Sequence, residues 1–143
     1  MSDSIAAWVI AGLEVLAALG ITAYWITWFR SSHDEPWLPD GYIDHEAPFV
    51  YTDAVLAIVL VVAAILQVTD DPASTAAVLV TGGRSVGASL GLIAAGMLAF
   101  LGILDLAYFA RTGLFKREHE GIINIGVVAS VLTLSLILIV RFL

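Results

Sequence analysis

Two acidic residues lie inside stretches of the chain that are otherwise apolar. Glu14 lies near the middle of the apolar stretch 5–29, and Asp105 lies near the end of the stretch 85–110. A carboxyl group within hydrocarbon is costly and usually marks a functional site. We therefore expect Glu14 and Asp105 to bind a proton or a small cation. The structural alternative for Glu14 is a hydrogen bond to a hydroxyl group on a neighbouring helix.

Asp105 belongs to a predicted cluster of ionisable side chains at one side of the membrane. It precedes Arg111 by six residues, which is roughly 9 Å along a helix. Asp53 enters the stretch 49–68 from the same side. Asp53 also has a structural explanation, because a carboxylate in the first turn of a helix complements the helix dipole. The candidate residues for binding a ligand or a proton are Glu14, Asp53, Asp105, Tyr108 and Arg111.

The histidines indicate a different chemistry, that of a divalent metal site. Imidazole and carboxylate groups are ligands of zinc and related metals, and the candidates here are His45, His119, Glu46 and Glu120. No two histidines lie one helical turn apart, as they do on zinc-binding helices. All three histidines are expected in loops, which favours solvated residues and argues against haem ligation between helices. The sequence alone names no cofactor.

Four apolar stretches must position these residues. About 20 helical residues are needed to cross the hydrocarbon core of a bilayer. The four stretches run over residues 5–29, 49–68, 85–110 and 122–143. Lipid offers the backbone no hydrogen bonds, and these stretches lack the alternation of barrel strands, so each is expected to be a helix. We expect an all-α fold, an antiparallel bundle of four transmembrane helices that forms one domain over residues 1–143.

The composition favours a membrane protein and excludes several other classes. The 143 residues are 60% hydrophobic and 13% charged, whereas soluble domains average about 25% charged residues. The chain has no cysteine, which excludes disulfides and thiol catalysis. Its formal net charge is -7 and it has no long basic run, so nucleic acid is not an expected partner. The expected surroundings are the lipid bilayer.

The connections between the apolar stretches differ in length and charge. Residues 30–48 form a long acidic loop whose aromatic side chains could dip back to the membrane interface as a short lid. In the second connection, Asp71-Pro72 favours a helix start and Gly82-Gly83 favours its end. A short interfacial helix over 73–80 is therefore expected. The third connection, 111–121, is compact.

The distribution of basic residues predicts an orientation in the cell membrane. Loops 30–48 and 111–121 share four Lys and Arg residues, whereas the opposite side has two. Cytoplasmic loops carry the excess of Lys and Arg, so both termini are expected on the non-cytoplasmic side. Residues 1–4 lack the basic start of a signal peptide. We therefore expect the stretch 5–29 to be a retained transmembrane helix.

Small residues recur at four-residue spacing in the third apolar stretch, at Gly87, Gly91, Ala95 and Ala99. Small side chains at this spacing let two helices approach closely. Such a contact can lie within the bundle or between subunits. A homo-oligomer through this face is therefore one of two alternatives.

The segment Leu13-Glu14-Val15-Leu16 places an acid midway through the first of the four predicted transmembrane helices. In this respect the chain resembles the small multidrug resistance transporters. The resemblance covers one helix and a single key residue, and it implies that Glu14 is a shared cation or proton site. The long acidic loop, Asp53 and Asp105 depart from the pattern of that family.

The buried acids predict a small integral membrane protein that is a non-enzymatic translocator or binds a small ligand or cation. One alternative is a membrane enzyme with a histidine and acid site at the mouth formed by loops 30–48 and 111–121. Another is an accessory subunit of a larger membrane complex. No complete catalytic constellation can be assembled from the sequence, which favours a protein that is not an enzyme.

Overall fold

The computed structural model describes the chain apart from residues 1, 35, 37, 39, 70–84 and 117. The described residues form helices, turns and loops and contain no β-strand. Among them, four segments are long and apolar enough to cross a membrane: Ser4–Arg30, Tyr42–Thr69, Val86–Thr112 and Gly121–Phe142. The predictions of an all-α fold and of a multi-pass membrane protein are confirmed.

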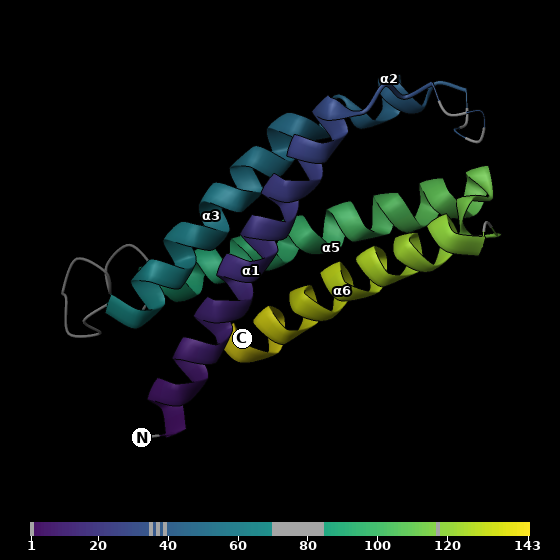
Figure 1. Cartoon of the computed structure of the whole chain (residues 1–143). Helices are drawn as coiled ribbons and strands as arrows, with labels where there is room; N and C mark the ends of the chain where they lie inside the picture. The colour runs from purple at the N-terminus through teal and green to yellow at the C-terminus, as the bar shows by residue number, and fades with distance from the viewer. Residues whose placement is uncertain (1, 35, 37, 39, 70–84, 117) are drawn as a thin grey trace. The chain divides into compact units, whose positions relative to one another are not determined.

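Figure 1 shows the helices in chain order. They are α1 (Ser2–Arg30), α2 (Tyr42–Glu46), α3 (Phe49–Thr69), α5 (Val86–Thr112), the 3-10 helix η1 (Leu114–Lys116) and α6 (Glu118–Phe142). The four long helices match the four predicted stretches to within a few residues at each end. Helix α2 adds a single turn inside the acidic loop. The short helix expected over 73–80 lies outside the described residues.

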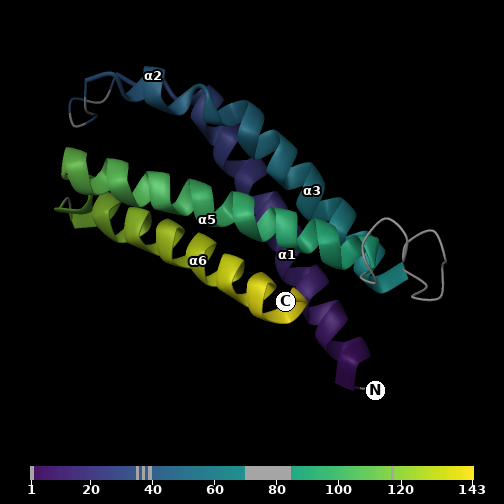
Figure 2. The same ribbon diagram turned by 180° about the vertical axis from the view of Figure 1, so that it is seen from behind.

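The described chain separates into two compact units, Met1–Leu90 and Gly91–Leu143. Each unit is built around a pair of long antiparallel helices, α1 with α3 in the first and α5 with α6 in the second (Figures 1 and 2). The first unit also contains α2 and the first residues of α5. The organisation of 1–143 as one domain stays a prediction.

Helices α1 and α3 pack along a seam of small and branched side chains. The buried apolar residues of this seam are Ile10, Ala11, Ala18 and Trp25 of α1 and Leu56, Leu60, Ala63 and Ala64 of α3. The alanines lack bulk, which lets the two backbones approach closely. Outside the seam both helices expose large apolar side chains, such as Leu16 and Ile58. Such surfaces are expected where a helix faces lipid.

In the second unit, α5 and α6 pack through a comparable seam. Its buried residues include Ala94, Ala95, Leu98 and Leu101 of α5 and Val128, Leu134, Ser135 and Leu138 of α6. The Ser135 hydroxyl donates a hydrogen bond of 2.8 Å to the carbonyl oxygen of Ala95, so this buried polar group is satisfied across the seam. Gly113 follows α5 with φ 76, a left-handed conformation that glycine adopts without strain.

The start of α5 lies against the end of α3. The Ser85 hydroxyl accepts a hydrogen bond of 3.1 Å from the backbone N–H of Ala88, and this N-cap sets where α5 begins. Gly87 then contacts the backbone of α3, where a Cβ added to Gly87 would lie 2.8 Å from the nitrogen of Gln67. Any side chain at this position would therefore force the two helices apart.

The small residues of α5 have contacts within the chain. Gly87 lies against α3, and a Cβ added to Gly91 would overlap the ring of Phe142 on α6. Ala95 is completely buried in the seam with α6. These contacts support the intramolecular alternative for three of the four residues. A homo-oligomer that uses the same face, including Ala99, stays a prediction.

We predict that Gly87→Ala lowers the stability of the protein, whereas Gly96→Ala does not. Both substitutions add one methyl group to α5, and at Gly96 nothing lies within 4 Å of the added atom. Overpacking costs about 1–3 kcal/mol, while alanine at an open helical position is neutral or slightly favourable. Thermal unfolding of both purified variants in one detergent measures the difference. Equal midpoints would contradict the close approach of α3 and α5 at Gly87.

Candidate functional site

Glu14 lies in the interior of the α1–α3 pair, where its side chain is completely buried. Its Oε2 atom accepts a hydrogen bond of 2.6 Å from Nε2 of Gln67. Its Oε1 atom is buried and has no hydrogen-bond partner among the described residues. The structural alternative named a hydroxyl group as the partner of Glu14, but the group observed is an amide on α3. One carboxyl oxygen is thus left for a ligand or a proton.

Four positions at seven-residue intervals along α2 and α3 lie on the side that faces α1, and three of them are polar. The positions that follow one another at this spacing are Glu46, Asp53, Leu60 and Gln67. Seven residues make close to two helical turns, so successive positions lie on one face. Leu60 is completely buried. The three polar positions each bond to α1, Glu46 to Tyr24, Asp53 to Trp25 and Gln67 to Glu14.

At the loop end of this seam, aromatic side chains of α1 hold two carboxylates. The Tyr24 hydroxyl donates to Oε2 of Glu46 at 3.0 Å, and Nε1 of Trp25 donates to Oδ2 of Asp53 at 2.9 Å. The first turn of α3 contains no acidic residue, because Asp53 lies beyond it. The helix-dipole explanation of Asp53 is therefore wrong, and a hydrogen bond from Trp25 holds this carboxylate instead.

An apolar section separates the polar contacts at the two ends of the seam. Asp53 and Gln67 are 14 residues apart, which is roughly 21 Å along a helix. The buried residues between these levels are Ala18, Leu56, Leu60, Ala63 and Ala64. The described part of the seam therefore contains no chain of polar side chains that connects Asp53 with Glu14.

The metal hypothesis gains no support from the described side chains. Among them, no group of three or more His, Cys, Asp or Glu residues could hold a metal ion. His45 packs on the ring of Phe49, with ring centroids 5.3 Å apart. The side chains of His119 and Glu120 lie outside the described part of the structure, so a site that joins them to His45 and Glu46 stays a prediction.

Two histidines differ from the expectation that all three lie in loops. His45 belongs to α2 and His119 belongs to α6, whereas His33 does lie in the loop after α1. His45 is helical because the residues after Gly41 form one helical turn. In this turn the His45 N–H donates to the carbonyl oxygen of Gly41, and the Ala47 N–H donates to the carbonyl oxygen of Ile43. The loop position therefore no longer argues against a role for His45.

Three further candidates, Asp105, Tyr108 and Arg111, lie on α5 in the second unit. Their spacing of three residues makes successive members neighbours on the helix surface. Asp105 and Tyr108 are half-buried, and Arg111 is exposed. Asp53 belongs to the first unit, so the gathering of all these residues at one mouth stays a prediction.

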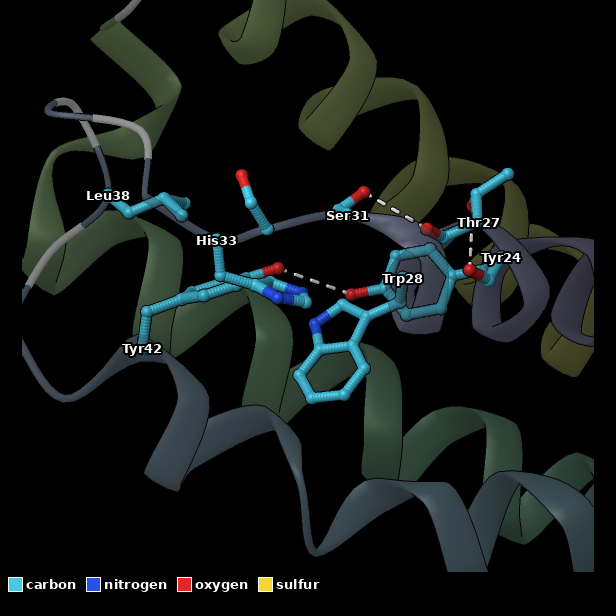
Figure 3. A pocket seen from close by; sticks show the side chains of 8 residues that line it. Tyr24, Thr27, Trp28, Ser31, His33, Leu38 and Tyr42 are labelled. Carbon is cyan, nitrogen blue, oxygen red and sulfur yellow. Dashed lines mark hydrogen bonds between the residues drawn. The ribbon is translucent and has the colours of Figure 1, made fainter.

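A cavity of about 470 Å³ lies at the C-terminal end of α1 (Figure 3). Its lining residues are Tyr24, Thr27, Trp28, Ser31, Ser32, His33, Leu38 and Tyr42. They come from the last turns of α1, the loop that follows and the start of α2. The sequence did not predict this cavity. The available signal was the spacing of Tyr24 and Trp28, because aromatic residues four apart share one face of a helix.

We predict that Trp25→Phe destabilises the protein by about 1–3 kcal/mol, because it leaves the carboxylate of Asp53 without its donor. Trp8→Phe is the matched control, since the Trp8 side chain is 65% exposed. Adding Asp53→Leu to Trp25→Phe should restore part of the loss, because no unsatisfied carboxylate then remains. Unfolding in detergent measures the three variants. If both tryptophan variants unfold at one temperature, Trp25 does not support Asp53.

Comparison with known proteins gives no relative from which a function could be transferred. No protein-family model, no curated protein and no solved structure matches this chain. The resemblance to the small multidrug resistance transporters thus rests on the segment around Glu14 alone, and function must be argued from the residues of this chain.

Proposed function

We propose that the protein binds a proton at Glu14, inside the α1–α3 pair, and transfers protons across the membrane. The observation that carries this proposal is a completely buried carboxyl group with a hydrogen bond to only one of its oxygens. The one partner is the neutral amide of Gln67, which cannot balance a negative charge. A proton on Oε1 would make the side chain neutral.

The cost of burying a charge supports a proton or a cation bound to the carboxyl group of Glu14. An ionised carboxylate in an apolar interior is very costly unless a cation pairs with it. Among the described residues, the Glu14 oxygens bond to Gln67 and to no basic side chain. A proton or a bound cation must then supply the positive charge. Hard metal cations take six or more oxygen ligands, which Glu14 and Gln67 do not supply, so we favour the proton.

The arrangement of the seam favours a gated translocator over an open proton channel. Glu46 and Asp53 lie at the loop end, and the apolar section around Leu60 separates them from Glu14. Direct proton transfer requires hydrogen-bond contact or one bridging water. Protons can therefore pass between these levels only when water enters the section or the helices move.

A hydrophobic carbodiimide tests the protonation of Glu14. The carboxyl O–H adds across one C=N bond of the reagent, and the adduct rearranges to an N-acylurea, so the protein gains the mass of one whole reagent molecule. We expect one label on the parent at neutral pH and none on Glu14→Gln. Glu46→Gln is the matched control and should label like the parent, because the Glu46 carboxylate is held by Tyr24.

Equal labelling of Glu14→Gln and the parent would refute a protonated Glu14. Protection of the parent by sodium ions would instead identify a metal cation as the occupant. Proton transfer is measured with purified protein in liposomes that contain a pH-sensitive dye. We expect at least a tenfold loss of proton flux in Glu14→Gln. Asp105→Asn serves as the parallel variant for the acid of α5.

We further propose that loops 30–48 and 111–121 face the cytoplasm and both termini lie outside, because basic residues are in excess on the side of these loops. The chain contains no cysteine, so a single introduced cysteine reports one position. A membrane-impermeant thiol reagent applied to intact cells should label Ser2→Cys and spare Lys116→Cys. Labelling of Lys116→Cys alone would reverse the orientation.

A further inference from the structure

The seam between α1 and α3 is polar at both ends and apolar in between. Asp53 accepts a hydrogen bond from Trp25 at the loop end, and Gln67 donates to Glu14 at the other end. Every side chain of α3 from residue 54 to residue 66 is apolar. No side chain in this section of α3 can therefore carry a proton from one end of the seam to the other.

Helix α1 contributes no polar side chain to this section of the seam either. Between Glu14 and Tyr24, its one polar side chain is that of Thr22. Thr22 is exposed, and its hydroxyl donates to the carbonyl oxygen of Ala18 in the same helix at 2.8 Å. A hydroxyl group that lies outside the seam and bonds within its own helix does not bridge the two ends. The apolar section thus extends over both helices.

Leu60 lies halfway along this apolar section. It is seven residues from Asp53 and seven from Gln67, which is roughly 10 Å along the helix in each direction. Asp53 and Gln67 both bond to α1. Because seven residues make close to two turns, Leu60 lies on the same face of α3, and its side chain is completely buried. Leu60 is therefore the central apolar side chain between the two polar ends.

The residue of α1 at the level of Leu60 is Ala18. The two helices are antiparallel (Figure 1). Counting seven residues from the contact between Trp25 and Asp53 therefore leads to Ala18 on α1 and to Leu60 on α3. Ala18 is also buried. Protein interiors are close-packed, so a leucine that lies opposite an alanine leaves little room for water at this level.

We propose that Leu60 is the barrier that separates the proton at Glu14 from the loop end of the seam. Leu60 has this role only if Glu14 carries the transferred proton, so the role rests on the proposed function. Direct proton transfer requires hydrogen-bond contact or one bridging water, and roughly 10 Å on either side of Leu60 exceeds that reach. A polar side chain at position 60 would bring water into the section and open a path for protons.

Leu56 provides a matched control for Leu60. It is the other buried leucine of α3, but it lies only three residues from Asp53. A polar side chain at position 56 would leave 11 residues before Gln67, an apolar stretch of roughly 16 Å. The same substitution at position 60 divides the section into two halves of roughly 10 Å. The two positions therefore differ in the length of the barrier that remains.

Proton flux into liposomes that contain a pH-sensitive dye tests the barrier with the full chain. Asparagine is close to leucine in size, so Leu60→Asn changes the polarity of the seam more than its packing. We expect at least a tenfold rise in flux over the parent for Leu60→Asn and parent-like flux for Leu56→Asn. Parent-like flux in Leu60→Asn overturns the proposal, and so does an equal rise in both variants. If Leu60→Asn does not fold, the smaller polar variant Leu60→Ser decides the question.

A double variant connects the gain in flux to Glu14. The path opened by Leu60→Asn leads to Glu14, so adding Glu14→Gln should remove the gain. A gain that persists in the double variant would overturn the proposal, because the protons would then avoid Glu14. The proposed function fails separately, if Glu14→Gln alone leaves the flux of the parent unchanged, whereas the barrier fails if Leu60→Asn alone leaves it unchanged.

The reactivity of a cysteine at the level of Leu60 reports water without any proton flux. The chain has no cysteine of its own, so Ala18→Cys introduces a single thiol into the seam. A thiol reacts as the thiolate, which does not form in dry apolar surroundings. We expect silver ions to block this thiol at least tenfold faster when Leu60→Asn is also present, and at an unchanged rate with Leu56→Asn. Equal rates with and without Leu60→Asn would overturn the proposal, because Leu60 would then not exclude water.

Discussion

Hydrocarbon offers no hydrogen bonds, so the chain itself must satisfy each polar group in its membrane-spanning helices. Several hydroxyl groups do this within their own helix; Thr22 and Ser130, for example, donate to carbonyl oxygens four residues earlier. The Ser135 hydroxyl uses a carbonyl oxygen of the neighbouring helix. The acids at the loop end use the donors of aromatic side chains. Oε1 of Glu14 has no hydrogen-bond donor among the described residues. A functional role is therefore proposed for Glu14 and not for the acids at the loop end.

Much of the architecture follows from local sequence patterns, because a membrane-spanning helix satisfies its own backbone. The four long helices and the burial of Glu14 could therefore be predicted from apolar length and position alone. The close packing of Gly87 and Gly91 also followed, because small residues at four-residue spacing indicate a contact face. Each of these features depends on one helix at a time, and none requires knowledge of which helices are partners.

The remaining features depend on pairings between distant parts of the chain. Gln67 is 53 residues from Glu14, and nothing near either residue indicates that they meet. For Asp53 the sequence offered the helix dipole as the structural alternative, because the start of a helix can be predicted locally but its partner Trp25 cannot. The cavity beside Trp28 requires the loop to fold back over the end of α1, and His33, which has a left-handed conformation, takes part in that fold.

The seven-residue repeat on α3 has a consequence for how the first helix pair is held in register. Apolar side chains discriminate poorly between neighbouring alignments, since one leucine packs much like another. A shift of α3 by one repeat would bring Leu60 to the level of Glu14 and leave the carboxyl group without its amide. Polar residues in coiled coils specify alignment in the same way, at some cost in stability. The polar contacts between α1 and α3 thus specify one alignment of the two helices.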